Sequence, residues 1–79
     1  MSHTAHELAE EFPAEVAKIH DLKVNNALFA KLAEDYHRVN QQVCRAETRV
    51  DVLSGEHESE LRHKRAHLKD EIARILRAV

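Results

Sequence analysis

The sequence predicts an all-α protein: an antiparallel two-helix coiled-coil hairpin preceded by a short N-terminal helix. Of the 79 residues, 33% are charged and only 4% are aromatic, which is typical of long helices rather than of sheets. Apolar residues recur at steps of three and four over two long stretches. The single glycine of the chain separates these stretches. We therefore expect residues 1–79 to form one helical-hairpin domain.

Pro13 marks the beginning of the first expected helix. Proline fits the first position of a helix and disfavours helical geometry in the residue before it. We therefore expect a short helix over residues 13–23, after a flexible or partly helical N-terminus over residues 1–12. Val24, Asn25 and Asn26 then interrupt the apolar pattern, and the side chain of either asparagine can accept hydrogen bonds from the free amides of a new helix, which is expected to begin near Asn26.

The first arm of the hairpin, expected over residues 26–53, has the strongest pattern in the chain. Its apolar side chains recur at alternating steps of three and four: Phe29, Leu32, Tyr36, Val39, Val43, Ala46, Val50 and Leu53. This strict period indicates a coiled-coil seam, because the stripe of an ordinary globular helix is wider and drifts at 3.6 residues per turn. Asn40 lies beside the seam, at neither core position, and is expected to face solvent.

The second arm is expected over residues 56–79. Gly55 can adopt the left-handed conformation that ends a helix, so the chain is expected to reverse there. The seam of this arm continues at steps of four and three: Leu61, Arg65, Leu68, Ile72, Ile75 and Val79. At Arg65 only the aliphatic stem can be buried. Two arms of about 25 residues each span roughly 37 Å, and this match in length predicts antiparallel pairing.

Val16, Ile19 and Leu22 form a narrow apolar stripe on the short helix, because residues three apart share one helix face. Leu76 lies beside the seam of the second arm and is an obvious partner for this stripe. The four residues either pack on one another or form a surface for another chain. They are the candidate interaction residues.

Arg62, Lys64 and Lys69 belong to the most basic stretch of the chain and are the candidate anion-binding residues. The formal net charge is -2, so the protein has no overall positive field that would attract nucleic acid. Glu58 and Glu60 each precede a cation by four residues, which balances part of the charge on the helix surface. No aromatic residue lies among these cations to stack on bases. Nucleic acid is therefore not the expected partner.

His63 and His67 lie four residues apart on the second arm, a spacing that places both rings on one helix face, where zinc could bridge them. Lys64 follows the first histidine, where the known helical zinc motif has glutamate, so no metal is expected. A histidine-dependent response to metal or pH is left open. Cys44 and His37 are two helical turns apart and too distant to form a nucleophile and base. We expect no catalytic residue and no cofactor.

The cysteine content and the N-terminus indicate a compartment. Cys44 is the single cysteine, which excludes an intrachain disulfide and gives no sign of an oxidising environment. The first residues, MSHTAHELAEEF, lack the basic start and apolar run of a signal peptide, and no stretch approaches the roughly 20 apolar residues of a membrane span. We therefore expect a cytoplasmic protein without a membrane segment.

Short segments over nearly the whole chain form a moderately specific combination: Phe12, Pro13, Ile19, His20, Asp21, Leu22, Lys23, Phe29, Leu32, Tyr36, His37, Arg45, Glu47, Leu68, Lys69, Asp70 and Glu71. In this combination the chain resembles the YdcH-like family of small bacterial proteins, a domain of unknown function. The resemblance implies a helical hairpin in a bacterial cytoplasm. It carries over no catalytic or ligand-binding residue, and it implies no established activity.

These observations predict a small non-enzymatic helical protein that mediates protein–protein interaction or self-association. A two-helix hairpin buries little apolar area, so a protein partner or a second copy would supplement its stability. A nucleic-acid or anion-binding accessory protein is the alternative. Two helices and a short third helix are expected to enclose no cavity for a small-molecule substrate.

Overall fold

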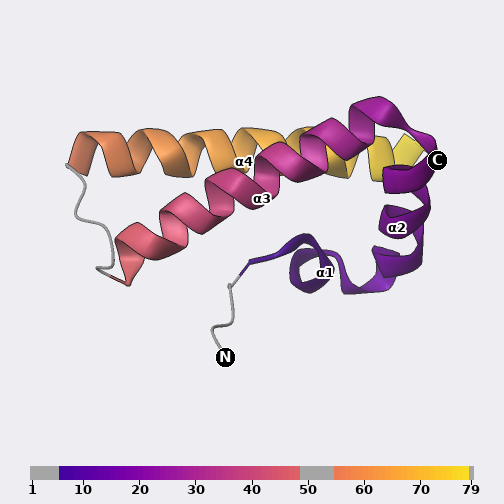
Figure 1. Ribbon diagram of the computed structural model, residues 1–79, viewed down its shortest axis with the longest axis horizontal. Coiled ribbons are helices and arrows are strands. Elements are labelled where there is room, and N and C mark those ends of the chain that lie inside the picture. The colour runs from indigo at the N-terminus through magenta and orange to yellow at the C-terminus, as the bar shows by residue number, and fades with distance from the viewer. Residues whose placement is uncertain (1–5, 49–54, 79) are drawn as a thin grey trace.

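The computed structural model describes residues 6–48 and 55–78, and every regular element within these ranges is helical (Figure 1). Two short elements precede three longer helices: α1 (Leu8–Glu11), a 3₁₀ helix (Pro13–Glu15), α2 (Val16–Asn25), α3 (Ala27–Glu47) and α4 (Gly55–Ala78). The prediction of an all-α fold is therefore confirmed.

The elements at the N-terminus differ in detail from the expected short helix over residues 13–23. Pro13 does begin a helical segment, but the first turn is a 3₁₀ helix, and α2 starts at Val16 and continues to Asn25. Before the proline, residues 8–11 form the single turn α1 within the segment that was expected to be flexible or partly helical.

Of the two asparagines that the sequence offered as caps, Asn26 caps the N-terminus of α3. Its backbone is extended, and its side-chain Oδ1 accepts a hydrogen bond of 3.0 Å from the Phe29 amide. This bond satisfies one of the amides that a helix start leaves unpaired. The same residue ends α2, because its own amide donates to the Leu22 carbonyl at 2.8 Å. Asn26 therefore fixes the corner between the two helices.

The structure ends α3 at Glu47, whereas the sequence predicted an arm that continues to residue 53. The Thr48 hydroxyl donates to the carbonyl of Cys44 at 2.8 Å. Such a bond from a side chain competes with the continuation of a helix, and β-branched residues have a lower helix propensity than leucine or alanine. The predicted seam residues Val50 and Leu53 lie outside the described residues.

Most of the buried apolar residues lie on α3 and α4, which contact each other and cross at an angle in Figure 1. Each predicted seam residue of α3 that the structure describes is buried or half-buried. The buried apolar residues of the described chain are Leu8, Ile19, Phe29, Ala33, Tyr36, Val39, Val43, Ala46, Leu68, Ile72 and Leu76. The predicted burial of these positions is therefore confirmed over α3. The predicted seam residue Val79 lies outside the described residues.

The short helix α2 packs on α3 and contacts the end of α4. Ile19 and Leu76 are 5% and 4% exposed and belong to one core cluster, against which Leu22 also packs. Lys18 Nζ donates to the Leu76 carbonyl at 3.3 Å, which joins α2 to the end of α4. Of the two alternatives for the apolar stripe, the structure shows Ile19 and Leu22 packing in the same core cluster as Leu76. Val16 alone of the four candidate interaction residues stays exposed, at 47%.

Gly55 does not adopt the left-handed conformation that the sequence predicted. It is the first residue of α4, and its φ is not positive. The acidic residues Glu56 and Glu58 occupy the first turn of α4, where negative charge interacts favourably with the helix dipole. Gly55 is thus the first residue of α4, and it does not end α3.

Candidate functional site

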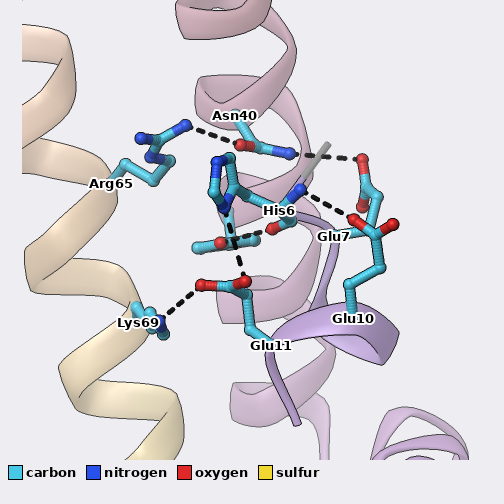
Figure 2. Close-up of polar contacts among 8 residues, drawn as sticks. His6, Glu7, Glu10, Glu11, Asn40, Arg65 and Lys69 are labelled. Carbon is cyan, nitrogen blue, oxygen red and sulfur yellow. Dashed lines mark hydrogen bonds and ion pairs between the residues drawn. The ribbon is translucent and has the colours of Figure 1, made fainter. Parts of the chain in front are cut away.

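The N-terminal segment formed by residues 6–12 lies across α3 and reaches α4, and it contains the single turn α1 (Figure 2). From here on, "the arm" means this segment, residues 6–12, and the two long helices are named α3 and α4. Leu8 is its one buried side chain, and Phe12 packs against the edge of the core. The other contacts of the arm are polar. One turn of helix is not stable in isolation, so these contacts with α3 and α4 hold the arm in place.

Tyr36 of α3 connects the arm to the core. Its side chain is 1% exposed, and its hydroxyl donates a hydrogen bond of 2.6 Å to the His6 carbonyl. Burial raises the pKa of Tyr36 to about 12, and the negative charges of Glu11 and Glu7 act in the same direction. The sequence identified this residue as part of the seam but gave no sign of its bond to the arm.

We expect the Tyr36 phenol to titrate near pH 12 in the folded protein, compared with about 10 for an exposed tyrosine. Because the folded-state pKa is raised, the stability that the neutral phenol contributes is complete below pH 10 and is lost as the pH rises through 12. Tyr36 is the single tyrosine, so the phenolate absorbance in a pH titration measures it directly. A midpoint near 10, equal to that of the denatured chain, would contradict this burial.

Asn40 was predicted to face solvent, and this prediction is wrong. Its side chain is 0% exposed. Its Oδ1 accepts a hydrogen bond of 3.0 Å from Arg65 Nη1 of α4, and its Nδ2 donates to Glu7 Oε1 of the arm at 3.4 Å (Figure 2). Buried amides of this kind are hydrogen-bonded because an unpaired polar group costs free energy. Asn40 therefore joins α3 to both α4 and the arm.

The physical reason for this error is the third layer on α3. Ala33 and Asn40 lie seven residues apart on the flank beside the seam, and both are buried. In a two-helix coiled coil this flank would be open to solvent. Here the arm and α2 cover it, which widens the buried stripe. The one signal in the sequence is that both flank positions are uncharged, whereas the next position on the same flank is Glu47.

Two further carboxylates hold the arm. Lys69 Nζ of α4 donates to Glu11 Oε1 at 2.5 Å, and this hydrogen bond is the main cause that lowers the pKa of Glu11. The same ammonium lies 5.9 Å from the centroid of the Phe12 ring, within the range of a cation–π contact. Glu7 pairs with His37 Nδ1 at 3.0 Å. The arm therefore presents acidic side chains to positively charged and amide groups of the hairpin.

The structure brings together two of the three predicted anion-binding residues. Arg62 and Lys69, with Arg65 between them, line a hollow of about 240 Å³ that also contains His6, Glu11, Tyr36 and Ala66. Lys64 is exposed and does not line this hollow. Carboxylates already pair with the two predicted cations. Arg62 donates to Glu58 at 3.1 Å and to Glu47 at 3.3 Å, and Lys69 donates to the arm.

A second hollow, here called the α2–α3 groove, is lined by these two helices and by part of the arm. It consists of two adjoining parts of about 280 and 270 Å³ that share Lys23, Ala33 and His37. The remaining lining residues are Glu7, Leu8, Ala9, Val16, Ile19, His20, Ala30 and Glu34. Ala30 and Ala33 are small residues on one face of α3, and they leave the space that larger side chains would fill. The prediction that the helices enclose no cavity did not foresee this groove.

The histidines and the cysteine singled out in the sequence do not form a cluster in the described part of the chain. His63 and His67 are both exposed on α4, and Cys44 is half-buried on α3. Within residues 6–48 and 55–78, no group of three or more histidine, cysteine or acidic side chains is placed to hold a metal ion. None of the helices in these ranges has the length and apolar character needed to cross a membrane.

One comparison with known proteins identifies the family of the chain. The model of a family described as "Protein of unknown function (DUF465)" matches residues 29–76, which are 48 of the 79 residues. The match covers most of α3 and α4, whose seam and polar contacts are described above. No curated protein and no solved structure matches the chain. The resemblance to YdcH-like proteins is confirmed, since they belong to the matched family. The chain is a member of the DUF465 family of proteins of unknown function.

Proposed function

We propose that the protein is a non-enzymatic interaction protein that binds a helical segment of a partner protein in the α2–α3 groove. The observation that carries this proposal is the groove itself, an open apolar hollow bordered by two helices. An amphipathic helix that lies in such a groove inserts apolar side chains at a spacing of three or four residues. The partner helix would thereby cover the apolar surface that α2, α3 and the arm leave exposed in the groove.

The side chains of the groove define the chemistry of the partner. Val16 is 47% exposed at one side, and the floor is formed by Ile19 and Ala33. These surfaces suit a branched apolar side chain such as leucine or isoleucine. Lys23 lies where the two parts of the groove meet, and it forms no ion pair with a described carboxylate. An acidic residue beside the inserted apolar side chain would pair with this ammonium.

The other predicted modes of binding have less support. Leu76 is buried in the core and does not line the groove, so within the monomer it offers no surface to a second copy. Of the candidate anion-binding residues, Arg62 and Lys69 already pair with carboxylates, and Lys64 lies apart from them. The exposed Val16 and the groove beside it are the part of the predicted interaction surface that stays open.

We also propose that α3 and α4 form an antiparallel coiled-coil hairpin. Contacts between the two helices support this arrangement. Arg62, near the start of α4, bonds to Glu47 at the end of α3, and Arg65, one turn later in α4, bonds to Asn40, two turns earlier in α3. Residue numbers therefore increase along α4 as they decrease along α3, which is the pairing expected of antiparallel helices. The heptad period of the seam supports coiled-coil packing.

Photo-crosslinking in the native cell tests the groove. A photoreactive amino acid at position 16 is expected to form an adduct with a partner protein, whereas the same amino acid at position 24 is not. Val24 is the matched control because it is 71% exposed and does not line the groove. Once the partner is identified, Val16→Asp is expected to weaken its binding at least about tenfold, and Val24→Asp to leave it unchanged. No adduct at position 16, or identical adducts at both positions, would contradict the proposal.

A further inference from the structure

The arm is attached to the hairpin through a small set of contacts that involve its side chains and one carbonyl. Leu8 is buried and Phe12 packs at the core edge, while Glu7 and Glu11 bond to groups of α3 and α4. The backbone of the arm contributes the His6 carbonyl, which accepts from Tyr36. The pattern Glu-Leu-x-x-Glu-Phe thus presents two acidic and apolar pairs, four residues apart, to one face of the hairpin.

The arm joins the rest of the chain through the 3₁₀ turn, residues 13–15. Pro13 and Ala14 in this turn are exposed, and neither belongs to the core. The turn can therefore change its direction without disturbing the packing of α2, α3 and α4. A short terminal segment that buries one apolar side chain and is otherwise held by polar contacts opens more readily than the core helices. Once open, it leaves Tyr36, Asn40 and Lys69 available to an identical segment.

From these contacts we propose that the arm is exchanged between two copies of this chain, so that residues 6–12 of each copy bind the hairpin of the other. The second copy is the partner with the correct chemistry, because its arm carries the same carboxylates and apolar side chains. Every contact made within one chain is made between chains in the exchanged dimer, so only the turn at residues 13–15 must change. The inference does not depend on a partner for the α2–α3 groove.

Charge complementarity supports the exchange and makes it measurable. Glu11 of the arm pairs with Lys69 of α4 at 2.5 Å. Glu11→Lys places two ammonium groups together within a single chain, and Lys69→Glu places two carboxylates together. In an exchanged heterodimer of these two variants, the unchanged Glu11 of one chain meets the unchanged Lys69 of the other, and the two substituted side chains meet each other with opposite charges. Both contacts are then restored, whereas each variant alone repels its own arm.

The experiment mixes the two variants at equal concentration and measures the dimer fraction by sedimentation velocity. We expect the Glu11→Lys and Lys69→Glu mixture to contain at least about five times more dimer than either variant alone. The control mixture replaces Lys69→Glu with Lys64→Glu, which makes the same change in charge on an exposed residue that does not contact the arm. The chain that carries both Glu11→Lys and Lys69→Glu restores the pair within one chain and between exchanged chains, so its dimer fraction should equal that of the unsubstituted protein at the same concentration.

Circular dichroism is used first to measure the helicity of each variant. We expect every variant to keep the helicity of α3 and α4, because neither Glu11 nor Lys69 belongs to the core. The exchange would be overturned if the Glu11→Lys and Lys69→Glu mixture contained no more dimer than either variant alone. It would also be overturned if the control mixture reached the same dimer fraction as this mixture. Failure of this test would leave the groove proposal standing, because photo-crosslinking at position 16 reports on a different partner. Conversely, absence of the crosslink at position 16 would count against the groove proposal alone, because the dimer fraction of the charge-reversed variants is measured independently of it.

Discussion

Replacing Phe29 with alanine is expected to lower the free energy of unfolding by about 3–5 kcal/mol. Phe29 is 0% exposed and lies in the core cluster with Ile72 and Ile19. The substitution removes the ring and leaves a cavity that the surrounding helices fill only partly. Native proteins have about 5–15 kcal/mol of total stability, so a loss of this size is a large part of it. Urea denaturation followed by far-ultraviolet circular dichroism measures the effect.

Leu28→Ala is the matched control for this prediction. Leu28 is the preceding residue in α3 and is 65% exposed, so its truncation is expected to change the stability by less than about 0.5 kcal/mol. Both substitutions lie in the first turn of the same helix, and alanine favours helix in both. Equal effects of the two substitutions would show that Phe29 is not in the core.

Replacing Asn40 with leucine is expected to lower the free energy of unfolding by about 1.5–3 kcal/mol, the range for a hydrogen bond to a charged group. The change removes the acceptor of the half-buried Arg65 guanidinium. It also removes the amide that donates to Glu7 of the arm. Thermal and urea unfolding provide the measurement, and Gln41→Leu, at the exposed neighbouring position, provides the control.

The double variant Asn40→Leu with Arg65→Met tests whether the stability lost in Asn40→Leu comes from leaving the Arg65 guanidinium without its hydrogen-bond acceptor. Removing both partners of a buried polar contact costs much less than removing one, because no charged group is left unpaired. We therefore expect the double variant to be more stable than Asn40→Leu alone. Additive losses from the two substitutions would contradict the contact between Asn40 and Arg65.

The parts of the fold that the sequence predicted are those set by local, repeating patterns. The steps of three and four predicted the buried face of α3 because burial of one face of a long helix imposes that period. Asn26 was recognised as a cap because its side chain acts on an amide three residues away. Both features depend on neighbours within one turn or on a regular spacing, and so they can be read from the chain.

The arm and the buried amide could not be predicted in the same way. Tyr36 and Asn40 bond to residues 30 and 33 positions away, and Lys69 bonds to a residue 58 positions away. No periodic pattern encodes contacts of this length. Once the arm covers the flank of α3, a position that a two-helix seam would expose becomes buried. The α2–α3 groove was missed for the same reason, because it exists only where α2, α3 and the arm meet.

The central claim is that Asn40 is the buried residue that joins α4 and the arm to α3, and the nuclear Overhauser effects of its side-chain amide test it most directly. The structure predicts cross-peaks from these amide protons to the Arg65 side chain and to the Glu7 side chain, since both groups lie within hydrogen-bond distance of the amide group. It also predicts slow exchange of these protons with water, because the side chain is 0% exposed. Rapid exchange with water and no cross-peak to either residue would contradict it and would restore the solvent-facing position that the heptad pattern alone predicted.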